Sequence, residues 1–283
     1  MSVPIPFSDI GKPTRDLLSK DFITHGFKLE AKTTAPNGVS FKVAGIKDAK
    51  SGLILGDLET KWANKANGVT FTQAWTTANQ LKAKVEFENN LAKGLKVDLD
   101  TMFVPSTGAK NAIIKADYKQ PSVHSVATLD VFKTQVAVDT VIGREGFLAG
   151  AEVGYDVANG LVSRYNTALG YVGPDYTVNL HATNSLSMYT ASYYHCVSPA
   201  IETGAKATWD TKNNNVVGLE VGTRYRLDPD TAIKAKVNNF GVLAMSYTQA
   251  LKPGVKVTLA AQVDTTRFEE DVHRVGVAFT LEN

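Results

Sequence analysis

Few side chains in this sequence are spaced for catalysis or metal binding. Cys196 is the single cysteine, so an internal disulfide is excluded, and its thiol has no recognisable catalytic partner. Gly150 and Gly154 of GAEVG would suggest a dinucleotide or helix-packing motif only if they lay outside a strand. The histidines are scattered one to a region, without the close spacing of metal ligands: His25, His124, His181, His195 and His273. We therefore expect no enzyme, no metal site and no cofactor.

The charged side chains are more informative, because they alternate with apolar ones. The stretch 216–237 reads VVGLEVGTRYRLDPDTAIKAKV and is interrupted by the turn LDPD. Successive side chains of a β-strand point to opposite faces. Each of its two halves therefore predicts a strand with one apolar and one charged face. The apolar row holds Val217, Leu219, Val221, Tyr225, Ile233, Ala235 and Val237, and the charged row holds Glu220, Arg224, Arg226, Lys234 and Lys236.

The same alternation recurs along the chain in segments of about 8–11 residues, including the segment FLAGAEVGYD that contains Gly150 and Gly154. Turn residues separate the segments, such as NG at 37, 67 and 159, DPD at 228 and KPG at 252. From about residue 26 onward there are about eighteen or nineteen such segments, which indicates a meander of hairpins.

Composition limits the alternatives. The 283 residues are 43% hydrophobic and 20% charged with a net charge of +2, which is ordinary for a folded protein and too balanced for nucleic-acid binding. The N-terminus lacks the pattern of a secretory signal and is a poor mitochondrial presequence. No window is apolar enough for a membrane helix. Hydropathy alone would indicate a soluble protein, but a membrane β-barrel hides its apolar face in every second residue.

Two arrangements fit this alternation. A soluble sandwich would bury the apolar rows between two sheets. So many strands in one twisted sheet would more naturally close into a barrel, which removes exposed edges. Side chains cannot fill so wide a barrel, so the charged rows would line water and the apolar rows would face lipid. The charged rows carry a slight basic surplus, too small for strong ionic discrimination.

The N-terminal region departs from this pattern. Residues 7–22, FSDIGKPTRDLLSKDF, do not alternate and predict a short amphipathic helix with Ser8 as its N-cap and Pro13 kinking or interrupting it. The residues alone leave three positions open: on a membrane surface, inside the barrel, or as a surface helix. One side of the helix gathers Ile10, Leu17, Leu18 and Phe22, and the other gathers Lys12, Arg15, Asp16 and Lys20.

Several motifs resemble those of the eukaryotic mitochondrial porins, the voltage-dependent anion channels. Residues 225–259, YRLDPDTAIKAKVNNFGVLAMSYTQALKPGVKVTL, are similar to the family's signature region. VPIPFSDIGKPTRDLLSKDF resembles its N-terminal helix, and Gly94, Leu95 and Lys96 match its GLK motif. GREGFLAGAEVGYD looks most like the fungal members. The signature residues at the family's spacing are Tyr225, Asp228, Thr231, Lys236, Asn238, Asn239 and Tyr247.

The resemblance implies an all-β transmembrane barrel of nineteen strands, the number known for this family, closed by one parallel pair. Residues 1–25 would form an N-terminal segment whose helix lies in the lumen, and residues 26–283 the barrel. The implied function is a voltage-gated, weakly anion-selective diffusion pore for ATP, ADP, phosphate, respiratory substrates and small ions in the mitochondrial outer membrane. Implied partners are anionic metabolites and nucleotides, membrane lipid, a second copy of the chain, cytosolic kinases and the outer-membrane barrel assembly machinery.

Candidate site residues follow from the pattern and the resemblance together. Lys12, Arg15, Asp16 and Lys20 on the helix would set selectivity and gating. Gly94, Leu95 and Lys96 would contact nucleotide, although a plain wall lysine is the simpler interpretation of Lys96. Arg274, Gly276, Phe279 and Leu281 resemble the C-terminal sorting signal of mitochondrial barrels. The basic residues of the pore wall would be Lys28, Lys32, Lys61, Lys84, Lys96, Lys115, Lys234 and Lys236.

Two departures from the family are visible. Many animal members have several glycines between helix and first strand, whereas KDFITHGF has only Gly26, which argues against a freely swinging helix. Gln73 stands on the lipid-facing row between Phe71 and Trp75, where some relatives place a carboxylate. Alternative functions are a protein-import barrel of the same superfamily, a poorly conducting porin paralogue, and a soluble β-barrel binder.

Overall fold

A computed structural model describes residues 3–24, 26–48, 51–64, 67–89, 92–212, 216–270 and 272–283. No helix within these ranges is long and apolar enough to cross a membrane. Two short helical elements, η1 (Phe7–Asp9) and α1 (Lys12–Ser19), precede the strands. The strands are β1 (Gly26–Thr34), β2 (Val39–Lys47), β3 (Ile54–Asn64), β4 (Val69–Thr76), β5 (Leu81–Glu88), β6 (Leu95–Val104), β7 (Ala109–Gln120), β8 (Val123–Asp130), β9 (Gln135–Arg144), β10 (Phe147–Asp156), β11 (Leu161–Val172), β12 (Tyr176–Thr183), β13 (Met188–Ser198), β14 (Ile201–Asp210), β15 (Val217–Asp228), β16 (Thr231–Asn238), β17 (Val242–Lys252), β18 (Val255–Asp264) and β19 (Arg274–Glu282).

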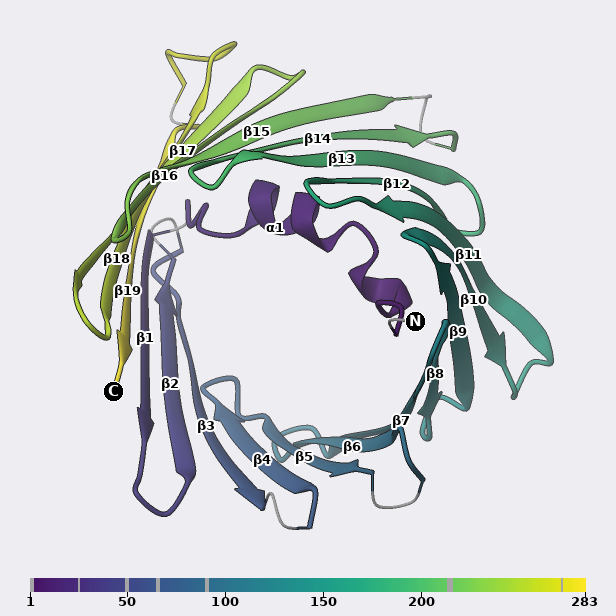
Figure 1. The fold of residues 1–283 in the computed structure, drawn as a ribbon. Helices are drawn as coiled ribbons and strands as arrows, with labels where there is room; N and C mark the ends of the chain where they lie inside the picture. The colour runs from purple at the N-terminus through teal and green to yellow at the C-terminus, as the bar shows by residue number, and fades with distance from the viewer. Residues whose placement is uncertain are drawn as a thin grey trace.

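The strands form one closed sheet of nineteen (Figure 1). Each strand pairs antiparallel with the next, and the ring closes where β1 runs parallel to β19, from Gly26 opposite Gly276 to Lys32 opposite Glu282. An odd number of strands in a meander forces one parallel pair, because the first and last strands then run in the same direction. The predicted fold is confirmed, including the parallel closure.

Short turns join most of the strands, as the turn signals predicted. Between β9 and β10 only Glu145 and Gly146 lie outside the paired residues Arg144 and Phe147, and both have positive φ, 52° and 89°. Two consecutive left-handed residues match the right-handed twist of a hairpin and favour glycine at the second position. At this hairpin the chain therefore returns on itself without a loop, which places β10 directly beside β9 in the ring.

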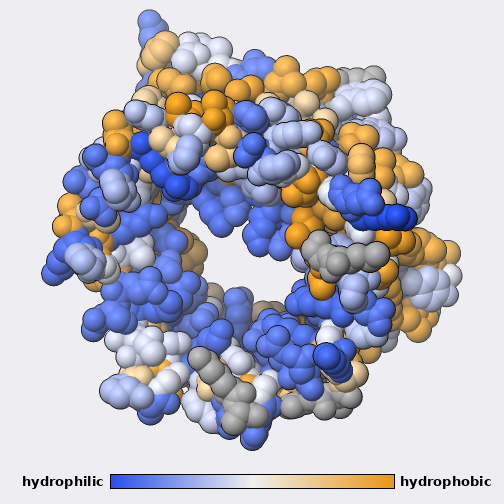
Figure 2. Space-filling model, viewed as in Figure 1, coloured by the Kyte–Doolittle hydropathy of each residue, from blue (hydrophilic) through white to orange (hydrophobic). Residues whose placement is uncertain are grey.

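The inner and outer faces of the ring differ in polarity. Figure 2 looks through an open passage lined mostly by hydrophilic residues. Large apolar side chains of the outward rows are exposed, for example Phe27, Leu29, Val43 and Leu169. The main buried apolar cluster is on the inside, where Phe7 and Ile10 pack against Val141 and Ala168. The hydrophobic packing of this molecule is thus largely between the N-terminal segment and the wall, while the outward apolar rows of the described strands have no protein cover.

Candidate functional site

The candidate site is the passage enclosed by the sheet, and contacts with the N-terminal segment show which row of each strand faces it. Lys234 and Lys236 of β16 contact backbone carbonyls of residues 20 and 18. The pairing register then carries this inward row around the ring, through Arg224 and Gly222 on β15 and onward. By this register the predicted charged rows face the lumen, and Val221, Tyr225 and Val237 face outward.

The N-terminal segment lies inside the lumen, where Figure 1 shows α1 within the ring. Helix α1 is N-capped by Gly11 in the left-handed region, with φ 75°, and Pro13 lies in its first turn. The predicted roles of Ser8 as N-cap and of Pro13 as a kink were wrong. Proline is tolerated in the first turn because the amide there has no helical acceptor, so Pro13 begins the helix instead of interrupting it.

The buried side of this segment rests on inward glycines of the wall. A Cβ added to Gly150 would lie 2.8 Å from the Phe7 ring, and one added to Gly204 would lie 2.9 Å from Leu17 Cδ2. A Cβ on Gly222 would lie 2.6 Å from Leu18 Cδ2. Leu17 and Leu18 are 4% and 3% exposed. The absence of a side chain at these three wall positions creates the space that the apolar side of the segment fills.

The opposite side of the helix presents its charges to the lumen. Lys12 Nζ lies 3.1 Å from Asp9 Oδ2, and Lys20 Nζ lies 2.7 Å from Asp16 Oδ2. Arg15 donates to the carbonyl of Ser8 at 2.9 Å. The predicted cluster of helix charges is thus brought together at the surface of the lumen, each cation with a local partner.

Away from the segment, the wall carries a network of ion pairs. Lys84 Nζ lies 2.9 Å from Glu86 Oε1 and 3.2 Å from Asp98 Oδ2. Lys96 Nζ lies 3.1 Å from the same Glu86 oxygen. The GLK-motif residue Lys96 and its neighbour Lys84 therefore belong to one network on β5 and β6. Elsewhere on the wall, Lys28 pairs with Glu30, and Lys32 pairs with Glu282 across the parallel seam.

The remaining predicted wall lysines occupy different surroundings. Lys61 is exposed on β3, opposite Thr72 and Ser40, and Lys115 on β7 lies opposite Asp98 and Thr128. Lys234 and Lys236 instead lie beneath the N-terminal segment, and Lys234 is buried. The predicted set of eight is thus divided into lysines on the uncovered wall and two that the segment covers.

The slight basic surplus expected on the wall is not found among the described residues. The register extends the inward rows to carboxylates at strand ends, such as Asp130, Asp210 and Asp264, so the two signs are about equally represented. What differs is exposure. The Lys96 side chain is 28% exposed against 7% for its partner Asp98, and Arg226 is 46% exposed against 13% for Glu202.

Other predicted residues have clear structural positions. Gly94 precedes β6 with φ 82°, and a Cβ there would lie 2.6 Å from the carbonyl oxygen of Lys119, so a turn requires this glycine. Gln73 lies on the outward row with Phe71 and Trp75. In β19, Arg274 and Gly276 are on the inward row, and Phe279 and Leu281 are on the outward row.

Sequence reasoning missed two residues that hold the N-terminal segment. His124 is 2% exposed, with Nδ1 2.9 Å from the Pro4 carbonyl oxygen and Nε2 2.7 Å from Asp117 Oδ1. Asp21 follows the helix and pairs with Lys234 at 3.0 Å. The strand pairing places His124 on the inward row of β8, and its contact with Pro4 spans 120 residues of sequence. His25 lies outside the described residues, and within them no three His, Cys, Asp or Glu side chains converge to hold a metal ion.

Comparisons with known proteins agree with this architecture. The family model for eukaryotic porins matches residues 3–276. The chain is 45% identical over 286 residues to the mitochondrial outer membrane protein porin of Neurospora crassa, with all of both chains covered. It is 41% identical over 280 residues to the porin of that name from Candida albicans, covering 98% of this chain and 99% of the relative. It is 38% identical over 278 residues to the human non-selective voltage-gated ion channel VDAC3, covering 98% of each.

Solved structures show the same type of fold at low sequence identity. A triple mutant of the porin from Rhodopseudomonas blastica superposes with a TM-score of 0.51 and 9% identity, over 84% of this chain and 94% of that one. An identity this low supports the barrel architecture alone.

Proposed function

Because this chain belongs to the eukaryotic porin family, we propose that it forms a voltage-gated, weakly anion-selective diffusion pore in the mitochondrial outer membrane. It would pass ATP, ADP, phosphate, respiratory substrates and small ions. The outward rows then meet hydrocarbon and the inward rows meet water, which satisfies both faces of the sheet without a second protein layer. No catalytic step is involved, because diffusion needs only a charged aqueous path.

The observation that carries the anion preference is that the cation is more exposed than its carboxylate in most ion pairs of the lumen wall. Asp98 is nearly buried between Lys84 and Lys96, and Glu202 is more buried than Arg224 and Arg226. Basic side chains are long and extend their charge into water, whereas the shorter carboxylates remain near the wall. A lumen with balanced charge therefore presents mainly cations to a passing ion.

The helix adds to this preference. Lys12 and Lys20 have side chains 49% and 63% exposed, whereas their partners Asp9 and Asp16 are each 33% exposed. These charges lie within the lumen, where a low-dielectric wall focuses the potential. Screening shortens the reach of such charges to about 3 Å at 1 M salt, so the preference should be weak and should fall as salt rises.

Roles for the remaining residues follow from the same proposal. Lys28, Lys32, Lys61, Lys84, Lys96 and Lys115 would act as wall cations, with Gly94 and Leu95 positioning Lys96 for nucleotide contact. Arg274, Gly276, Phe279 and Leu281 would form the signal read by the barrel assembly machinery. Residues 1–25 and 26–283 would be the gating segment and the barrel. Lipid, a second copy of the chain and cytosolic kinases are proposed partners at the outer face and the rims.

The test is recording from the purified full chain in a planar lipid bilayer. The proposal expects large conductance steps that decrease at high voltage of either sign, with a mild preference for chloride over potassium that shrinks as salt is raised. Cation preference with block by presequence peptides would instead support a protein-import barrel. Absence of conductance from correctly folded protein would overturn the pore and favour a poorly conducting paralogue or a soluble binder.

A further inference from the structure

The C-terminal end of α1 has an unusual residue at the position that ends the helix. Lys20 is the C-cap, and Asp21 follows with φ 70°, in the left-handed region. Helices commonly end with a left-handed residue at this position, and it is usually glycine because a Cβ is disfavoured there. Aspartate tolerates the conformation better than most residues but gains nothing from it. A residue in such an unfavourable backbone conformation is usually held there by contacts with its surroundings, so the contacts of the Asp21 side chain matter.

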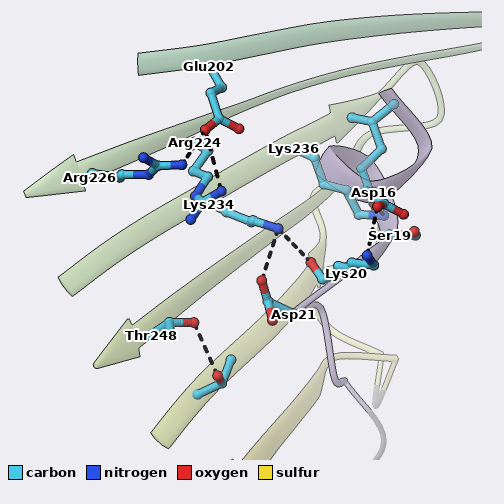
Figure 3. Close-up of polar contacts among 12 residues, drawn as sticks. Asp16, Ser19, Lys20, Asp21, Glu202, Arg224, Arg226, Lys234, Lys236 and Thr248 are labelled. Carbon is cyan, nitrogen blue, oxygen red and sulfur yellow. Dashed lines mark hydrogen bonds and ion pairs between the residues drawn. The ribbon is translucent and has the colours of Figure 1, made fainter. Parts of the chain in front are cut away.

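The carboxylate of Asp21 contacts the wall. Lys234 Nζ lies 3.0 Å from Asp21 Oδ2 (Figure 3). Lys256 Nζ lies 3.9 Å from Asp21 Oδ1. Burial raises the pKa of Asp21, but the hydrogen bond and charge of Lys234, with the charges of Lys256 and Arg224, outweigh it and hold the pKa below its ordinary value. Asp21 is therefore held as an anion against the cations of three strands, β15, β16 and β18.

Two wall lysines also cap the end of the helix. Lys234 donates to the Lys20 carbonyl at 3.1 Å, and Lys236 donates to the Leu18 carbonyl at 2.6 Å. The last carbonyls of a helix have no partner within it and carry partial negative charge. Lys236 also lies 4.7 Å from the centroid of the Phe22 ring and 2.9 Å from Glu220 Oε1. Both lysines thus contact the segment on either side of the helix end.

Lys234 also reverses the exposure pattern of the lumen. In the ion pairs of Lys96 and Arg226 the cation is more exposed than its carboxylate, but here Lys234 is 8% exposed and Asp21 is 32%. The charge of Lys234 is offset by the adjacent Asp21 carboxylate, and a buried lysine needs such partners to remain charged. Its position is therefore suited to holding the segment and not to attracting anions.

We propose that Lys234 and Lys236, together with Asp21, form a clamp that fixes the C-terminal end of α1 against the wall and so positions the helix charges in the lumen. The three residues are positioning residues: they set where Lys12, Arg15 and Lys20 stand without themselves lining the path. The electrical consequence rests on the proposed pore function, whereas the docking of the helix does not.

The test measures how often the helix leaves the wall. Thr14 is 1% exposed and lies against Gly204, so a cysteine there reacts with a water-soluble maleimide only when the helix moves. In the full-length chain carrying Cys196→Ser and Thr14→Cys, folded in lipid vesicles, Lys234→Met should raise the labelling rate about fivefold or more, because breaking a buried pair strands its partner. Ser19→Cys, on the exposed side of the helix, is the matched control and should label rapidly with or without the clamp.

Asp21 provides variants that leave the barrel strands untouched. Asp21→Gly relieves the strain of the left-handed conformation but removes the carboxylate. If the clamp holds the helix, labelling at position 14 should be faster despite the better backbone fit. Asp21→Asn keeps the conformation and loses the charge, and should also label faster. When Asp21→Asn is combined with Lys234→Met, the rate should be close to that of Lys234→Met alone, because Lys234→Met already removes the pair with Asp21 as well as the hydrogen bond to the Lys20 carbonyl.

The clamp is overturned if Lys234→Met and both Asp21 variants leave labelling at position 14 unchanged, or if the Asp21 and Lys234 effects simply multiply. A drop in chloride preference for Lys234→Met as large as that for Lys61→Met, with no change in labelling, would make Lys234 an ordinary wall charge. The labelling needs no current, so a folded barrel that fails to conduct would refute the pore while still testing the clamp. With conduction intact, Lys234→Met should also increase current noise in the open state.

Discussion

The two halves of the lumen wall are built from the same alternating pattern yet present different surfaces. From β9 to β16 the inward rows contain glycines, small residues and buried side chains beside some ion pairs, and the N-terminal segment covers the part that carries Gly150, Gly204 and Gly222. From β1 to β7 the inward rows are dominated by paired lysines and carboxylates that remain in contact with the passage. The first surface is the drier one, because there the wall leaves room for an apolar partner.

The comparison shows that alternation determines which row faces inward, while side-chain size determines what that row can hold. Gly204 and Gly222 lie opposite each other on β14 and β15, and together they accept Leu17 and Leu18. At the facing wall the inward row carries long charged side chains such as Lys84, which pairs with Glu86, in place of glycines. Burying those charges beneath apolar residues would cost several kcal/mol per unpaired ion.

The largest expected effect comes from filling the space beneath the helix. Gly222→Val would place a branched side chain where Leu18 packs, with the Ala235 carbonyl oxygen and the Lys236 Cβ each 3.2 Å from the new Cβ. We expect the helix to be displaced and to lose about 1.5–3 kcal/mol from the burial of one leucine. Trypsin cleavage within residues 12–20 of the folded barrel should then become about tenfold faster or more.

Gly218→Val is the matched control for that change. Gly218 is on the same inward row of the same strand, but its nearest neighbour to an added Cβ is the Thr208 carbonyl at 4.0 Å. Valine is favoured in strands, so this variant should fold and leave the N-terminal segment protected. Equal cleavage rates for the two valine variants would contradict the glycine-dependent docking surface.

The facing wall should respond to charge and not to volume. Lys61→Glu reverses an exposed charge on the inward row of β3, opposite Thr72 and Ser40. We expect the chloride-to-potassium permeability ratio to fall by about twofold at low salt and less at high salt, because screening shortens the reach of one charge. Reversal potentials in a salt gradient measure this, and trypsin protection of the N-terminal segment should be unchanged.

Lys110→Glu controls for net charge, because Lys110 pairs with Phe103 on the outward row near the start of β7. A shift in permeability as large as that of Lys61→Glu would mean that the lumen wall has no special role. If Lys61→Glu instead released the helix, the two halves of the wall would not act independently.

The sequence predicted which rows of side chains face inward and which face outward. It did not predict which part of the inner face the N-terminal segment covers. Alternation is local, so the inward position of Lys84 and the outward position of Val85 could be assigned from their immediate neighbours, and the strand pairing confirms both. The contacts of Asp21 and His124 join residues far apart in the chain, and periodicity carries no information about them. The role of the glycines beneath the helix could not be predicted either, because their lack of a side chain matters only where the helix packs against them, and the sequence does not show where that is.

The smallest expected effect is the pH dependence of the docked half, and it depends on one carboxylate. The groups facing Asp21 are Lys20 and Asp16 on the helix and, on the wall, Lys234, Lys256, Arg224, Glu202 and Tyr194. Since the folded chain lowers the pKa of Asp21, its contribution to docking is complete above the pKa of an unfolded aspartate, about 4, and is lost as pH falls through the lower folded value. The ion pairs from β1 to β7 do not hold the N-terminal segment. They can therefore weaken in acid without displacing it.

A nitroxide attached at neutral pH to Ser19→Cys, in the Cys196→Ser background, would report the mobility of α1 in vesicles as the pH is lowered. Mobility should stay constant from neutral pH to about 4 and rise below it. Asp21→Asn should already be more mobile at neutral pH and should lack the part of the acid response that comes from this residue. An identical acid response of the native chain and of Asp21→Asn would mean that other carboxylates release the helix. The two halves of the lumen wall would then differ only in the packing of the helix against glycines.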